Sequence, residues 1–143
     1  MPTIDFYVLS DAAPDAHLRH ACRIAEQAAE QDQRVFIRVA NEGDSKRLDD
    51  LLWTFGDRSF LPHEVVRAGL PPSHERIRVL IGSEPPTSFC DVVINLHTAI
   101  PADAGALQRI VELVPVADEL KRAARARFKA YRDAGHEPAT QNV

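Results

Sequence analysis

The sequence lacks the features that mark membrane, secreted and disulfide-stabilised proteins. Among its 143 residues there is no apolar run near the roughly 20 residues that a membrane span requires. The first ten residues, MPTIDFYVLS, have neither the basic segment nor the cleavage site of a signal peptide. The two cysteines, Cys22 and Cys90, form no CxxC pair, which is typical of a reducing compartment. We therefore expect one cytoplasmic domain, since a chain of this length can bury its own core.

Glycine is absent where a nucleotide-binding loop needs it. The segment TIDFYVL (3–9) alternates and is rich in β-branched and aromatic residues, which predicts a first strand. The following turn, SDAAPDA (10–16), contains no glycine. A dinucleotide-binding fold carries G-x-G-x-x-G at this place so that its backbone can approach the pyrophosphate. The six glycines of the chain are scattered and form no Walker-type loop, so the sequence argues against both kinds of nucleotide site.

No metal-binding pattern is complete. His17 and His20 lie three residues apart on a predicted helix, but only Asp15 and Glu26 are close in sequence as further ligands. A structural zinc site takes four protein ligands and a catalytic one takes three. We interpret the two histidines as part of a solvated helix face, and we expect neither a metal nor a cofactor.

The cysteines do not stand in a recognisable catalytic arrangement either. Cys22 falls on the apolar side of its predicted helix, as a small core residue does. Cys90 lies beside Asp91 and would need His97 as its base, but nothing in the sequence brings these residues together. We expect no catalytic residue. The alternative is a small α/β enzyme, a hydrolase or a nucleotide-binding protein, that uses Cys90 or a histidine.

Strand and helix patterns alternate along the N-terminal part of the chain, which is typical of an α/β fold. The segment RIVELVPV (109–116) fits either element, and its β-branched residues and Pro115 favour a strand. We predict a single Rossmann-like domain over residues 1–136, with a mostly parallel sheet flanked by helices, and a flexible tail over 137–143. The expected strands are 3–9, 34–40, 76–82, 91–97 and 109–116, and the expected helices are 14–31, 45–53 and 117–134.

The last predicted helix concentrates positive charge on an acidic protein. Residues 119–132 carry six Lys or Arg and one Glu, whereas the whole chain has a net charge of −4. Basic residues recur at spacings of four, four and three, with Phe128 beside them, and so form one stripe. Such a stripe can be a solvated face, a single-strand DNA site, or a receptor for a short acidic peptide with an apolar end and a free carboxylate. The acidic remainder of the chain disfavours the DNA site. The stripe consists of Lys121, Arg125, Lys129 and Arg132.

A second segment, LLWTFGDRSFLPH (51–63), gathers bulky apolar residues around the only tryptophan. Gly56, Asp57 and Arg58 interrupt it as a loop would, and Pro62 prevents a regular strand. Aromatic residues dominate cores and interfaces alike. From the residues alone, Trp53 and Phe60 either fill the core under the loop or belong to a surface that a partner covers.

These two blocks, in this order and at this chain length, resemble the chi subunit of bacterial DNA polymerase III holoenzyme. The matching stretches are LLWTFGDRSFLPH and VPVADELKRAARARFKAYRDAG, together with DFYVL and DVVINL. The resemblance implies a non-catalytic Rossmann-like subunit of the replisome, associated with the nucleoid. It further implies that the subunit links the clamp loader, through psi, to the acidic C-terminal tail of single-stranded-DNA-binding protein. Some members of the family also engage a helicase through the psi-binding surface.

The resemblance also implies two sets of site residues. Phe128 stands where tyrosine is common in relatives, so the stacking surface is kept and a hydroxyl group is lost. Within the aromatic segment, the resemblance favours a partly exposed patch that a partner helix covers. The tail-binding residues are Val114, Lys121, Arg125, Phe128, Lys129 and Arg132, and the psi-binding residues are Trp53, Phe55, Phe60 and Pro62.

Overall fold

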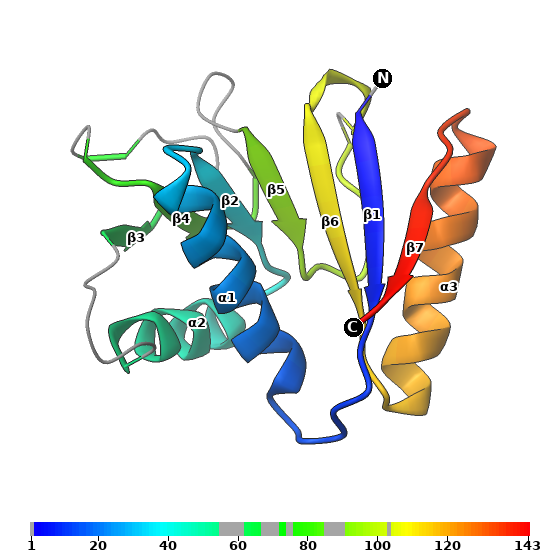
Figure 1. Ribbon diagram of the computed structural model, residues 1–143, viewed down its shortest axis with the longest axis horizontal. Helices are drawn as coiled ribbons and strands as arrows, with labels where there is room; N and C mark the ends of the chain where they lie inside the picture. Colours follow the sequence, from blue (N-terminus) through cyan, green and yellow to red (C-terminus); the bar gives the residue numbers. More distant parts are fainter. Residues whose placement is uncertain (1, 55–61, 67–71, 74–75, 85–90, 103) are drawn as a thin grey trace.

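A computed structural model describes residues 2–54, 62–66, 72–73, 76–84, 91–102 and 104–143. The described residues form one seven-stranded sheet in the order β3-β4-β2-β5-β6-β1-β7, and every strand pair in it is parallel (Figure 1). The predicted α/β class is therefore confirmed. The strands are β1 (Thr3–Val8), β2 (Val35–Arg38), β3 (His63–Val65), β4 (Val79–Gly82), β5 (Val92–Asn95), β6 (Arg109–Val114) and β7 (Ala139–Asn142). The helices are α1 (Ala16–Glu30), α2 (Glu42–Thr54), the short 3-10 helix η1 (Ala104–Ala106) and α3 (Asp118–Asp133).

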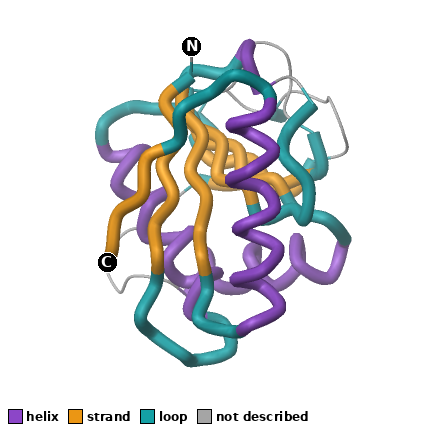
Figure 2. The backbone as a smooth tube through the Cα atoms, turned by 90° about the vertical axis from the view of Figure 1, so that its right-hand side faces the viewer, coloured by secondary structure: helices purple, strands orange, loops and turns teal. Residues whose placement is uncertain are grey.

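The helices cover both faces of the sheet. One core cluster joins α1 and α2 to one face, and contains Leu18 and Leu48 beside Val111. A second cluster joins α3 to the other face, and contains Tyr131 beside Ile110. Neighbouring residues of β6 thus enter different clusters, because successive side chains of a strand point to opposite faces. Helix α3 lies at the β1–β7 end of the sheet (Figure 1), and the view turned by 90° shows it running alongside the strands (Figure 2).

The central strands show no alternation, and apart from Asn95 at the end of β5 they are apolar. All four residues are buried in β4 (VLIG) and in β5 (VVIN). A parallel strand with helices or loops on both faces has no solvated side, so an uninterrupted apolar run is the sequence that such a strand requires. The ambiguous segment 109–116 contains β6, as its β-branched residues predict.

Helix α2 begins earlier than the sequence suggests. Its first residue is Glu42, and the side-chain oxygen of Asn41 accepts a hydrogen bond from the Asp44 backbone N–H at 2.8 Å. Asn41 therefore caps the helix, whereas the expected helix begins only at residue 45. The expected helix, 45–53, does not include this first turn. Glu42, Gly43 and Asp44 are not apolar, so the periodicity of apolar residues does not extend to them.

The C-terminal residues form a strand, whereas the sequence predicts a flexible tail over 137–143. Residues Ala139–Asn142 make β7, which pairs in parallel with β1 and aligns Thr140 with Phe6. The chain reverses after α3 at Gly135, whose φ of 92° suits glycine, and the His136 N–H donates to the Tyr131 carbonyl at 3.0 Å. All four residues of β7 are exposed. The strand is held by backbone hydrogen bonds and carries no hydrophobic pattern, so sequence periodicity does not reveal it.

Candidate peptide-binding site

A pocket lies between the inner edge of α3 and the β1–β7 end of the sheet. Its volume is about 240 Å³. The basic stripe and the adjoining strands supply its walls, so a charged helix face and an apolar sheet face meet in one place. Its lining residues are Phe6, Val8, Val114, Lys121, Ala124, Arg125, Phe128 and Thr140.

The apolar part of the pocket centres on Phe128. Its ring meets the buried ring of Phe6 in a T-shaped contact, with the centroids 5.1 Å apart. Val114, at the end of β6, is buried beside it. Phe128 itself is half-buried, so part of its ring packs against the core while the rest remains on the surface of the pocket. This arrangement suits an apolar side chain of modest size.

The charged part of the pocket comes from Lys121 and Arg125, one turn apart on α3. Arg125 is exposed and Lys121 is half-buried. Within the described part of the chain, neither side chain takes part in an ion pair. Both cations are therefore available to a carboxylate that enters beside Phe128.

The two remaining predicted residues of the stripe lie outside the lining. Lys129 donates a hydrogen bond to the Asp133 carboxylate at 3.4 Å, and both side chains are exposed. Arg132 is exposed in the last turn of the helix. The structure thus brings together Val114, Lys121, Arg125 and Phe128 in one pocket and leaves Lys129 and Arg132 on the adjacent surface.

Sequence reasoning missed the wall that the strands provide. Phe6 and Val8 belong to a strand that was predicted, but its place next to α3 depends on the strand order, which the sequence does not show. Thr140 belongs to β7, which was not predicted as a strand. Parallel pairing places Thr140 level with Phe6, and both then face α3.

Two residues of α3 face the sheet and not the solvent. Arg127 is 8% exposed, and its Nε donates to the Glu112 carboxylate at 2.9 Å. Tyr131, which the sequence places a little beyond Phe128 around the helix, is fully buried. The basic face of α3 is therefore narrower than the charge count of residues 119–132 indicates.

The second predicted site lies at the other end of the sheet. Trp53, near the end of α2, is 59% exposed, and its ring meets the ring of His63 with centroids 5.2 Å apart. His63 is buried, and its Nε2 lies 2.9 Å from the Asp49 carboxylate. Pro62 is half-buried. Trp53 is thus a surface residue and does not fill the core. Phe55 and Phe60 lie outside the described residues.

Leucines of α2 support this surface from the inner side of the helix. Leu48 and Leu52 are buried in the core cluster that α1 shares, and Leu51 packs against its margin. The spacing of these leucines in the sequence fits one face of a helix. The outward direction of Trp53 follows, because a helix with a buried stripe on one side presents the intervening positions to solvent.

In the part of the chain that the structure describes, the residues considered for metal binding are not brought together. Among the described residues there is no group of three His, Cys, Asp or Glu side chains placed to hold a metal ion. Burial raises the pKa of the Cys22 thiol to about 12, which leaves it protonated and unreactive. The His97 Nδ1 accepts a hydrogen bond from the Ala99 N–H at 3.0 Å, and Cys90 lies outside the described residues. No helix in the described ranges is both long enough and apolar enough to cross a membrane.

The parallel sheet with helices on both faces defines a Rossmann-like α/β protein, here with a cationic and aromatic pocket on its last helix. The family model described as DNA polymerase III chi subunit, HolC, matches residues 1–139. The chain is 36% identical over 137 residues to DNA polymerase III subunit chi of Pseudomonas aeruginosa, covering 95% of this chain and 93% of that protein. It is 34% identical over 139 residues to the subunit of the same name from Escherichia coli, covering 94% of each. A similar protein from Haemophilus influenzae is 29% identical over 142 residues. The chain therefore belongs to the DNA polymerase III chi subunit family, and is an accessory protein of DNA replication.

Proposed function

We propose that this chi-family protein is a non-catalytic adaptor that links the clamp loader, through psi, to the acidic C-terminal tail of single-stranded-DNA-binding protein. The observation that carries the proposal is the pocket on α3, where Lys121 and Arg125 stand beside the half-buried ring of Phe128. An acidic peptide with an apolar terminal residue has the complementary chemistry. Neither a cofactor nor a metal has a part in this function.

In the proposed complex, the terminal side chain of the tail enters the pocket against Phe128, Val114 and Phe6. Its carboxylates pair with Lys121 and Arg125, and Lys129 and Arg132 add to the attraction at the rim. Exposed ion pairs contribute only about 0–1 kcal/mol each, and burial of one aromatic side chain adds about 1.5–3 kcal/mol. Together these terms amount to at most about 7 kcal/mol before the cost of association, which suits a weak complex with a dissociation constant in the micromolar range or above. Such a contact can be made and released repeatedly.

The second docking face is the apolar surface at the end of α2. Its described members are Trp53, exposed beside His63, and Pro62, and the proposal adds Phe55 and Phe60. A large exposed aromatic next to a buried leucine stripe is typical of a surface that a partner helix covers. We assign this surface to psi. In members of the family that engage a helicase, we assign it to the helicase as well.

Titration of an acidic tail peptide that ends in phenylalanine tests the proposal. Arg125→Ala should weaken binding about fivefold, which corresponds to about 1 kcal/mol for an exposed charge pair. Arg122→Ala removes the same charge from an exposed position of α3 outside the pocket lining, and serves as the matched control. Equal loss in both variants would show that only net charge matters, and no loss in either would contradict the assigned pocket.

A further inference from the structure

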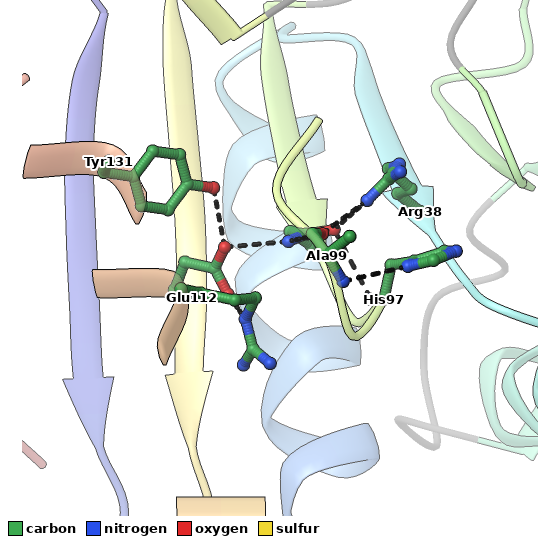
Figure 3. Close-up of polar contacts among 7 residues, drawn as sticks. Arg38, His97, Ala99, Glu112 and Tyr131 are labelled. Atoms are coloured by element: carbon green, nitrogen blue, oxygen red, sulfur yellow. Dashed lines mark hydrogen bonds and ion pairs between the residues drawn. The ribbon is translucent and has the colours of Figure 1, made fainter. Parts of the chain in front are cut away.

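A single buried carboxylate connects α3 to the sheet. Glu112, in β6, is fully buried and accepts three side-chain hydrogen bonds. One oxygen accepts from the Arg127 Nε at 2.9 Å, and the other from the Tyr131 hydroxyl at 2.6 Å and the Asn95 amide nitrogen at 2.8 Å (Figure 3). Both carboxylate oxygens are thus occupied, and two of the three donors belong to α3.

Neighbouring strands hold the carboxylate in place. Parallel pairing aligns Arg38 of β2 with Asn95 of β5, and Asn95 with Glu112 of β6. The Arg38 Nη1 donates to the Asn95 side-chain oxygen at 3.0 Å and to the Ala99 carbonyl at 2.7 Å. A guanidinium can only donate, so the oxygen of Asn95 must face Arg38 and its amide nitrogen must face Glu112. The row of side chains fixes the direction in which Glu112 accepts its bonds.

Apolar packing alone constrains α3 weakly. The buried residues of this 16-residue helix are Ala124, Arg127 and Tyr131, of which Ala124 is small and Arg127 is charged. The rings of Tyr131 and Phe128 add edge-on contacts with Phe6, but apolar contacts are less directional than hydrogen bonds and fix the rotation of a helix about its own axis less strictly. Two bonds one turn apart, from Arg127 and Tyr131, supply that direction.

The rotation of α3 decides the shape of the pocket. Phe128 follows Arg127 directly and therefore points about 100° further around the helix axis. Side chains of a helix end about 6 Å from its axis, so a rotation of about 20° displaces them by about 2 Å. A shift of that size would separate Phe128 from Phe6, whose ring centroid lies 5.1 Å away, and would move Arg125 relative to Val114.

We propose that Glu112 is a positioning residue, whose bonds to Arg127 and Tyr131 set the rotation of α3 and so hold Phe128 and the pocket cations in the arrangement that receives an acidic peptide. The inference rests on the proposed function of that pocket. A buried ion pair is a poor source of stability, since apolar residues of similar volume commonly replace it without loss. Its presence inside an apolar strand fits a role in orientation.

The test separates orientation from stability with two variants. Glu112→Gln removes the charge and places an amide NH₂ among three donors. The triple variant Glu112→Leu, Arg127→Leu, Tyr131→Phe replaces the whole network with apolar groups. Both should bind the tail peptide about tenfold more weakly than the unchanged protein, as misplaced binding groups do. Glu119→Gln makes the same charge change at an exposed position of α3 and should bind within about twofold of the unchanged protein, as surface charge changes do.

The decisive result comes from the triple variant. It replaces the carboxylate together with both of its donors on α3, so that none of the three is left unpaired, and it can be measured even if Glu112→Gln fails to fold. A melting temperature at or above that of the unchanged protein, combined with weakened binding, supports the role in orientation. A stable triple variant with full affinity would overturn it. The nuclear Overhauser contacts between the rings of Phe6 and Phe128 give a readout that needs no peptide, and both variants should change them. If the ring contacts in both variants are the same as in the unchanged protein, the positioning role is refuted. If the protein without substitutions does not bind the peptide, the proposed function alone is refuted.

Discussion

Two arginines on α3 show how much a residue's surroundings decide its role. Arg125 and Arg127 are two positions apart, yet one lines an exposed pocket and the other pairs with a buried carboxylate. In the sequence both are cations of the same basic run, and charge counting treats them alike. The distinguishing signal is Glu112, an acidic residue within the apolar strand RIVELV. A carboxylate in such a strand must find a donor on an element packed against it, which singles out an inward-facing arginine.

Burial of Glu112 predicts a pH dependence of stability that runs against the usual behaviour of a carboxylate. Desolvation raises the pKa of Glu112 above its ordinary 4.5, and Arg127, Asn95 and Tyr131 offset this only in part. Between 4.5 and the raised value, the folded protein binds more protons than the unfolded chain, so the free energy of unfolding falls as the pH rises through that range. Chemical denaturation should measure the free energy of unfolding of the unchanged protein and of Glu112→Gln. The stability advantage of the unchanged protein over the variant should shrink as the pH rises. A difference that grows with pH would contradict the raised pKa.

At the scale of elements, the helices and the central strands could be predicted and the last strand could not. Helix α3, over Asp118–Asp133, agrees with the predicted 117–134 because an apolar period and a glycine stop signal define it. β4 and the first three residues of β5 are continuous apolar runs, which favour buried strands. β7 is an exposed edge strand whose backbone bonds to β1 carry no sequence signal. Because β7 was not predicted, the wall of the pocket that Thr140 forms was not predicted either.

Strand β7 should contribute to recognition through Thr140. Thr140→Glu places a carboxylate on the wall of the pocket. It should weaken binding of the acidic peptide about fivefold, or about 1 kcal/mol, through charge repulsion and the cost of removing water from the new carboxylate. Gln141→Glu adds the same charge one residue on, where the side chain points to the opposite face of the sheet beside Tyr7. The control should bind as the unchanged protein does. Matching losses from the two substitutions, measured by titration calorimetry, would remove β7 from the site.

At the scale of the whole molecule, the two proposed docking faces lie at opposite ends of the sheet. α2 packs beside β3 at one edge, and α3 lies at the β7 edge (Figure 1). The sequence predicts two separate faces, because the aromatic segment and the basic helix are distinct in composition. Which strands lie beneath each face depends on the strand order, which comes from long-range pairing. Partners on the two faces would not compete for surface, as the proposed bridging role requires.

Separation of the faces predicts that each can be removed alone. Trp53→Ala should strongly reduce co-purification with psi, because truncation of a large exposed aromatic at an interface commonly costs 2 kcal/mol or more, about thirtyfold in affinity. Its affinity for the tail peptide should stay unchanged. Circular dichroism serves as the folding control, since Trp53 is exposed while Leu48 and Leu52 carry the core contacts of α2. Retained psi association, or a joint loss of both partners in a folded protein, would contradict two independent faces.

The central claim is that the pocket on α3 is the receptor for an acidic tail. Its most direct test is a chemical-shift map of ¹⁵N-labelled protein titrated with the tail peptide. The largest changes should fall on the backbone amides of Lys121, Ala124, Arg125, Phe128 and Thr140, with the α2 end of the sheet unaffected. Changes centred on α1 or α2, or none at millimolar peptide, would contradict the account.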